Sequence, residues 1–311
     1  MNMYLYKITK ENKLIDIKEI SIKKEKDLQN LCELNIDQIF SLKFVKSEFT
    51  VENFRIDTLA YDVSNNSFVI IEYKKDKNFS VIDQGYAYLS LMLNHKADFI
   101  LEYNENCKNT IKRNDIDWSQ SKVIFVSPVF TGYQKQSINF KDLPIELWEV
   151  KQFDNETIYF TPIRPVGAVE SIKTISKESD TIKQVSNEIK IYSEDELLIN
   201  TNEDIKDLYF KLKETILNLD NQIVFKPTKI YLAFILNKTN IVDIAAQKKS
   251  LKIWLNLSKG ELLDPENLLR DVSSIGHHGN GDYEIQIENE ENFDYLVSLI
   301  RQTINKKNKG K

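Results

Sequence analysis

Two carboxylates and an ammonium group, those of Asp57, Glu72 and Lys74, occur where two predicted strands would meet. The segment FVIIEYK, residues 68–74, is strongly apolar up to Glu72 and predicts a buried strand. Side chains alternate along a strand, so Glu72 and Lys74 face the same way. Asp57 lies on the preceding predicted strand, and a hairpin of suitable register would fold it back beside Glu72. Two carboxylates and one ammonium would then converge at one end of the hairpin.

Such a group of carboxylates favours the binding of a hard divalent cation. Two carboxylates held close together repel each other, and Mg²⁺ is typically bound by one or two carboxylates, waters and substrate phosphates. We therefore expect Mg²⁺ or Mn²⁺ to bind Asp57, Glu72 and the backbone carbonyl of Tyr73, whose side chain points away. Such an ion would polarise a phosphate and lower the pKa of a bound water, and Lys74 could orient that water.

The elements expected around these residues alternate between helices and strands. They are a helix within 25–42, a hairpin of strands 54–63 and 68–74, a helix over 80–95, strands within 97–104 and 121–130, and a hairpin over 145–163. Ser80, followed three residues later by Asp83, resembles a capping box and marks the start of the second helix. This order predicts an α/β fold with a mixed sheet flanked by helices.

The second half of the chain predicts a separate domain. Residues 167–196 are polar, rich in Ser, Lys and Glu, and are interpreted as a linker, in which some helix could form, between a domain over 1–166 and a domain over 197–311. The second domain is expected to be α+β. Its predicted helices cover 204–219 and 291–304, and its predicted strands lie within 229–237, 251–257 and 282–289.

Composition narrows the classes of protein further. The 311 residues carry a formal net charge of −5, which argues against a protein that coats nucleic acid by bulk charge. Cys32 and Cys107 have no CxxC or Cys/His spacing, so neither a zinc site nor a disulfide framework is indicated. No apolar stretch approaches the ~20 residues that a membrane helix needs. We expect a soluble, cytoplasmic protein.

The same residues resemble a known nuclease superfamily. The RID sequence at 55–57, the Glu72-x-Lys74 element, and Gln84 with Tyr88 on the following helix are similar to the PD-(D/E)XK superfamily, with Ile56 in the place of the proline. The resemblance covers about residues 25–160 and implies a restriction-endonuclease-like fold. Residues 268–287 resemble an uncharacterised domain found behind such nuclease-like modules, and this second resemblance implies no activity.

The resemblance assigns roles to individual residues. Asp57 and Glu72 match the metal ligands, Lys74 matches the catalytic lysine, and Gln84 matches a supporting polar group at the site. Glu48, in the sequence KSEF, corresponds to an additional acidic residue that some members use. The implied activity is Mg²⁺-dependent endonuclease or exonuclease hydrolysis of nucleic acid, with DNA as the expected substrate. A role in repair or in defence against foreign DNA follows by analogy with the family.

Other interpretations remain open at this stage. The charges could form a surface salt-bridge cluster, and without the resemblance Gln84 is most simply a helical residue that meets solvent. A nuclease-fold module could bind nucleic acid or a protein partner without cutting, and a homodimer is compatible with either function. Alternatively, the second domain could carry the function, with His277 and His278 in a glycine-rich loop as its site.

Overall fold

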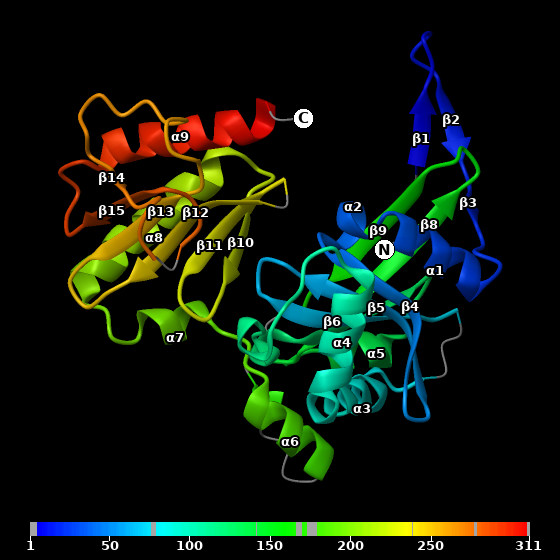
Figure 1. Cartoon of the computed structure of the whole chain (residues 1–311). Helices are drawn as coiled ribbons and strands as arrows, with labels where there is room; N and C mark the ends of the chain where they lie inside the picture. Colours follow the sequence, from blue (N-terminus) through cyan, green and yellow to red (C-terminus); the bar gives the residue numbers. More distant parts are fainter. Residues whose placement is uncertain are drawn as a thin grey trace. The chain divides into compact units, whose positions relative to one another are not determined.

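The computed structural model describes residues 5–75, 79–140, 142–165, 170–172, 179–237, 239–276 and 279–309. The chain forms two compact units, Met1–Ile191 and Tyr192–Lys311 (Figure 1). His277 and His278 lie outside the described residues. Within the described part of the chain, no helix combines the length and the apolar character that crossing a membrane requires.

The first unit is built around a mixed sheet. The strands of this sheet are β3 (Glu19–Ile20), β4 (Lys43–Val51), β5 (Phe54–Asp62), β6 (Ser67–Tyr73), β7 (Lys122–Ser127), β8 (Ile145–Phe153) and β9 (Ile158–Ile163). The strands β1 (Leu5–Ile8) and β2 (Leu14–Ile17) form a separate two-stranded antiparallel sheet. The helices of the first unit are α1 (Glu25–Leu34), α2 (Ile36–Phe40), α3 (Val81–Asn94), α4 (Lys96–Asn106), α5 (Gly132–Ser137) and α6 (Asp180–Glu188). The order of the mixed sheet is β3-β8-β7-β6-β5-β4, and β9 pairs with β8. The β6–β7 and β7–β8 pairs are parallel, whereas β4–β5, β5–β6, β3–β8 and β8–β9 are antiparallel.

Strand β6 is buried on both faces of this sheet. Phe68 and Ile70 pack in a core with residues of α3 and α4. Val69 and Ile71 point the other way, into a core with residues of α1. An apolar strand of this kind requires cover on both sides, because any exposed face would leave large apolar side chains in water. The predicted hairpin of β5 and β6, the helix α3 and the mixed α/β class are all confirmed.

Two expectations for this unit were wrong in detail. Residues 97–104 were expected to form a strand, but they belong to helix α4. Phe99 and Tyr103 are the buried residues of that helix and lie four positions apart, which is a helical spacing that a short apolar run conceals. The helix expected within 25–42 ends at Leu34 and is followed by the separate short helix α2. Strand β4 was not anticipated.

Part of the segment for which a linker was expected packs against the first unit. Residues 180–188 form helix α6, which begins after Ser179, whose hydroxyl accepts a hydrogen bond from the Ile182 amide. Val185 is fully buried, and Ile189 is nearly so, in the core that also contains residues of α3. These two apolar side chains in a polar stretch explain why α6 lies on the unit instead of in solvent.

The second unit has a different, antiparallel sheet. Its strands are β10 (Val224–Pro227), β11 (Leu232–Leu236), β12 (Thr239–Ala246), β13 (Leu251–Leu255), β14 (Arg270–Asp271) and β15 (Tyr283–Ile287), in the order β10-β11-β12-β13-β15-β14. Its helices are α7 (Glu194–Leu198), α8 (Glu203–Leu219) and α9 (Phe293–Lys309). Apolar residues of α8 and α9 share one core with the sheet. The prediction of a second α+β domain is confirmed.

We expect Val185→Ala to destabilise the first unit, because it removes two methyl groups from a site with 0% exposure. The loss should be roughly 2 kcal/mol of unfolding free energy, measured by chemical denaturation. Asn187→Ala, at an exposed position of the same helix, is the matched control and should change the unfolding free energy little. Equal effects of the two substitutions would show that α6 does not contribute to the core in solution.

Candidate functional site

The register of the central strands brings Asp57 and Glu72 together. The last registered pair of β5 and β6 is Thr58 with Ile71, so Asp57 and Glu72 are the next residues on the two strands. Asp57 Oδ2 accepts a hydrogen bond of 3.0 Å from the Tyr73 amide. This hydrogen bond forms where the backbone pairing of β5 and β6 ends. It holds the Asp57 carboxylate against β6.

The carboxylate of Glu72 lies inside the first unit and is bonded on both oxygens. The residue is 4% exposed. Glu72 Oε1 accepts from Lys74 Nζ at 2.7 Å and from Gln84 Nε2 at 3.0 Å. Glu72 Oε2 accepts from the Tyr88 hydroxyl at 3.0 Å. A buried charge needs such partners, and these donors keep the ionised carboxylate in one orientation.

Helix α3 carries Gln84 and Tyr88 to this point. The helix begins after Ser80, whose hydroxyl accepts from the Asp83 amide. Gln84 and Tyr88 are four residues apart and hence on one face, and Gln84 Nε2 lies 3.2 Å from the Tyr88 hydroxyl. Gly85 allows the helix to approach the sheet closely, since a Cβ atom there would lie 2.4 Å from Ile145 Cδ1. A glycine beside Gln84 is thus a requirement of the packing that delivers Gln84 to Glu72.

Burial and like charge oppose ionisation of Asp57. Burial is the larger effect and the charge of Glu72 adds to it, and together they raise the pKa of Asp57 to about 6. The hydrogen bond from the Tyr73 amide and the charge of Lys74 act in the opposite direction without cancelling the rise. The pKa of Tyr88 is also raised, first by burial and then by the charge of Glu72, so its hydroxyl stays a donor at neutral pH.

Glu48 lies next to Asp57 but is neutralised by cations. The β4–β5 pairs Ser47 with Thr58 and Phe49 with Ile56 flank the position where Glu48 would face Asp57. Glu48 has a positive φ of 54°, and its carboxylate contacts Lys26 Nζ at 2.7 Å and Arg55 Nε at 2.8 Å. The hydrogen bond with Lys26 is the first cause that lowers the pKa of Glu48. The expected additional acidic residue is therefore close, but it already has its counter-ions.

Helix α1 supports the site from the other side of the sheet. Gln29, 4% exposed, donates from Nε2 to the Asp57 carbonyl at 2.8 Å. Its carbonyl oxygen accepts from Lys26 Nζ at 3.2 Å. The sequence interpretation did not include Gln29 and Lys26. An amide between the apolar positions 28 and 32 of an amphipathic helix is the signal that could have indicated a buried polar contact.

The donor atoms suit a site in which water and phosphate complete the shell of a metal ion, and not a site in which protein supplies every ligand. Within the described residues, no group of three His, Cys, Asp or Glu side chains is placed to hold a metal ion. Asp57 and Glu72 supply two carboxylates whose mutual repulsion a cation would relieve. The Tyr73 carbonyl lies on the same side of β6 as the Tyr73 amide, and hence toward Asp57. Two carboxylates, a carbonyl, waters and a phosphate suit Mg²⁺ or Mn²⁺.

A comparison with curated proteins shows the family to which this chain belongs. The chain is 50% identical over 296 residues to an uncharacterized protein of Haemophilus influenzae, and the alignment covers 95% of this chain and 98% of that protein. The chain belongs to the family of this protein. Residues 194–303 also match the family described as a domain of unknown function, DUF5655. The expectation of an uncharacterised domain in the second half is thereby confirmed, and neither match brings an activity.

Solved structures give only weak likenesses. One is EndoMS in complex with double-stranded DNA, with 17% identity, coverage of 42% of this chain and 47% of that chain, and a TM-score of 0.29. Another is a repair endonuclease from Pyrococcus abyssi, with 19% identity, coverage of 42% and 49%, and a TM-score of 0.26. This chain therefore spans about half of each solved chain. A likeness this weak assigns neither a fold family nor an activity.

We expect Asp57→Asn to stabilise the metal-free protein in a pH-dependent way. The folded pKa of about 6 lies above the value of about 3.9 in an unfolded chain, so the protonated form favours folding. That contribution is complete below about pH 4 and is lost as the pH rises through 6. The wild type should therefore be less stable than Asp57→Asn at pH 8, by up to about 3 kcal/mol, and the difference should shrink toward pH 5.

Chemical denaturation in EDTA at several pH values measures this difference. Asp16→Asn, at an exposed position of β2, is the matched control and should change the unfolding free energy little. A wild type that is more stable than Asp57→Asn throughout the range would contradict the expected strain at this carboxylate.

Proposed function

We propose that the first unit is a metal-dependent nuclease of the PD-(D/E)XK superfamily that hydrolyses phosphodiester bonds of nucleic acid, with DNA as the expected substrate. The observation that carries this proposal is the buried carboxylate of Glu72, which lies next to Asp57 and is bonded by Lys74, Gln84 and Tyr88. These residues stand in the order and spacing by which the sequence resembles that superfamily. The hydrogen bonds to Glu72 support the proposal that these residues act together.

Each residue has a distinct task in this proposal. Asp57 and Glu72 hold Mg²⁺ or Mn²⁺ together with the Tyr73 carbonyl. The ion supplies Lewis-acid polarisation of the phosphate and lowers the pKa of a bound water. Lys74 positions the attacking water and stabilises the negative charge that develops on the phosphoryl oxygens. Gln84 and Tyr88 donate to Glu72 and fix its orientation, as partners of a metal ligand commonly do.

A purely structural salt bridge is a poorer explanation of the same contacts. Exposed ion pairs contribute less than ~1 kcal/mol, and a buried pair often contributes no more than apolar side chains of the same size. Here a second carboxylate, Asp57, lies beside the first and its pKa is raised in part by it. Fold stability gains nothing from two adjacent acidic groups, whereas binding of a divalent cation is favoured by them.

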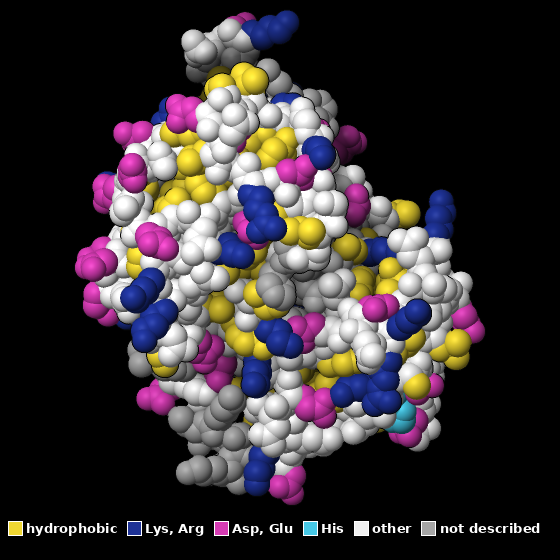
Figure 2. Space-filling view, turned by 60° about the vertical axis from the view of Figure 1, so that its left-hand side comes forward, with side chains coloured by type: hydrophobic (Ala, Val, Ile, Leu, Met, Phe, Trp, Pro, Cys, Tyr) yellow, Lys and Arg dark blue, Asp and Glu magenta, His cyan; other side chains and the backbone are white. Residues whose placement is uncertain are grey.

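Local charge offers a place for the phosphate backbone. Basic and acidic side chains are interspersed on the face shown in Figure 2, in agreement with the net charge of −5. At the end of β6, however, the Lys75 amide donates to Glu25 at 2.6 Å and Lys75 Nζ donates to the Lys23 carbonyl at 3.0 Å. These bonds bring the exposed Lys75 side chain, one residue along the chain from Lys74, to Lys23 just before α1. Binding of nucleic acid should therefore be local and sensitive to salt.

We expect wild-type protein with Mg²⁺ or Mn²⁺ to nick supercoiled plasmid or to cut single-stranded DNA, and EDTA to abolish the cutting. Glu72→Ala and Lys74→Ala should each lower the rate by roughly a hundredfold or more, since each removes a group that acts on the transition state. Lys122→Ala and Glu146→Ala are matched controls, because these residues form an ion pair of 2.6 Å elsewhere in the same sheet. Their activity should stay close to that of the wild type.

Two results of this assay would reject the cutting function. They are no cutting of either DNA by the purified wild type, and equal cutting by the wild type, Glu72→Ala and Lys74→Ala. Either result would favour the nuclease-fold module that binds nucleic acid or a protein partner without cutting it.

We expect a fragment of residues 1–191 to retain the metal-dependent cutting chemistry, because the candidate site lies wholly in the first unit. The fragment must include α6, whose Val185 lies in that unit's core. Plasmid and single-strand assays on the fragment and the full chain measure the outcome, with Glu72→Ala in the fragment as the control. A folded but inactive fragment beside an active full chain would move the function toward the second unit.

A further inference from the structure

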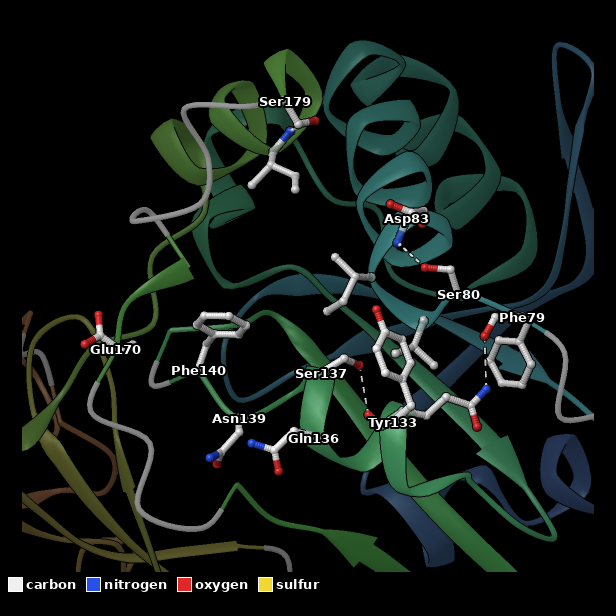
Figure 3. Close-up of a pocket in the computed structure, with 14 residues that line it drawn as sticks. Phe79, Ser80, Asp83, Tyr133, Gln136, Ser137, Asn139, Phe140, Glu170 and Ser179 are labelled. Carbon is white, nitrogen blue, oxygen red and sulfur yellow. Dashed lines mark hydrogen bonds between the residues drawn. The ribbon is translucent and has the colours of Figure 1, made fainter.

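A cavity of about 760 Å³ lies in the first unit beside the start of α3. Its walls come from the residues that lead into α3, from α5 and the turn after it, and from the start of α6 (Figure 3). The rings of Phe79, Tyr133 and Phe140 line it, together with the amide side chains of Gln136 and Asn139. Figure 3 shows Tyr133 projecting between Phe79 on one side and Phe140 on the other.

The lining suits an uncharged planar group with hydrogen-bonding edges. None of the 14 described residues that line the cavity is Lys or Arg, and two of them, Asp83 and Glu170, are acidic. Aromatic faces and amide side chains are the usual partners of nucleobases outside a duplex. Tyr133 is 82% exposed, so its ring is available to a ligand and contributes little to the core.

One shared wall connects this cavity to the candidate active site. The ring centroid of Phe79 lies 5.8 Å from Lys74 Nζ. The same ring packs on Phe125 with centroids 5.7 Å apart, and the Phe79 carbonyl accepts from Gln134 Nε2 at 3.0 Å. Phe79 is thus held in place between the cavity and the lysine. The wall that Phe79 forms therefore lies next to the lysine at which the proposed function puts the phosphate.

We propose that the cavity binds an unpaired nucleobase of the strand whose phosphate lies at Asp57, Glu72 and Lys74. This inference rests on the proposed nuclease function and adds a requirement for the substrate. A base inside a duplex cannot enter a side cavity, so the strand near the scissile phosphate must be single-stranded or have a base turned out of the helix. Tyr133 provides the stacking surface, and the amides of Gln136 and Asn139 meet the edge of the base.

The test measures binding in EDTA, where the metal-dependent reaction cannot proceed. A fluorescently labelled single-stranded DNA oligonucleotide and an abasic oligonucleotide of equal length are titrated with the full-length protein. We expect the wild type to bind the base-containing strand more tightly than the abasic one. Tyr133→Ala should weaken binding of the base-containing strand by about fivefold to a hundredfold, and Tyr133→Phe should retain it. Tyr133→Ala should leave binding of the abasic strand unchanged.

Tyr159→Ala is the matched control, because Tyr159 is a half-exposed tyrosine on β9 and does not line the cavity. Equal binding of the two strands by the wild type, equal effects of Tyr133→Ala and Tyr159→Ala, or no binding of either strand would overturn the inference. The outcome is separable from cutting. A protein that cuts DNA but is indifferent to Tyr133→Ala would retain the proposed function and lose this site. Binding of bases through Tyr133 without any cutting would retain this site and reject the proposed cutting function.

Discussion

The first unit depends on one buried charge, the carboxylate of Glu72, at the end of an otherwise apolar strand. Because Glu72 is 4% exposed, its charge must be compensated inside the protein. Lys74 on the same strand and Gln84 and Tyr88 on α3 provide that compensation. These bonds fix the position of α3 relative to β6, and the contact of Gly85 with Ile145 sets how closely the helix approaches the sheet.

The neighbouring carboxylates differ in how far they are compensated. Glu48 has Lys26 and Arg55 as counter-ions, and its pKa is lowered. Asp57 has the Tyr73 amide and the Gln29 contact to its backbone carbonyl, and its pKa is raised. The site therefore retains one carboxylate that is costly to ionise without a cation. Unfavourable groups of this kind often occur at functional sites, where a bound ligand or metal relieves the cost.

The arrangement around α3 links the proposed chemistry to a proposed substrate. The helix delivers Gln84 and Tyr88 to Glu72 from one face, and the residues that lead into it form a wall of the cavity. Phe79 belongs to that wall and lies over Lys74. The proposed phosphate site and the proposed base site thus share one short segment, which would let a protein with a net charge of −5 bind a nucleic acid strand locally.

The sequence by itself determined the buried strand β6, the hairpin with β5 and the start of α3 at Ser80, because alternation and capping are local properties. The groups that could bind a metal were predicted from residue chemistry and stay a prediction. The sequence could not determine the helix α4, the packing of α6, or the contacts of Gln29, Lys26 and Tyr88. Short apolar runs do not distinguish helix from strand, and the partner of a polar side chain on a helix depends on which elements pack against it. Only the tertiary structure decided that Tyr88 donates to Glu72 and that Glu48 is already paired. Both outcomes follow from strand register and helix packing, which join residues far apart in the chain.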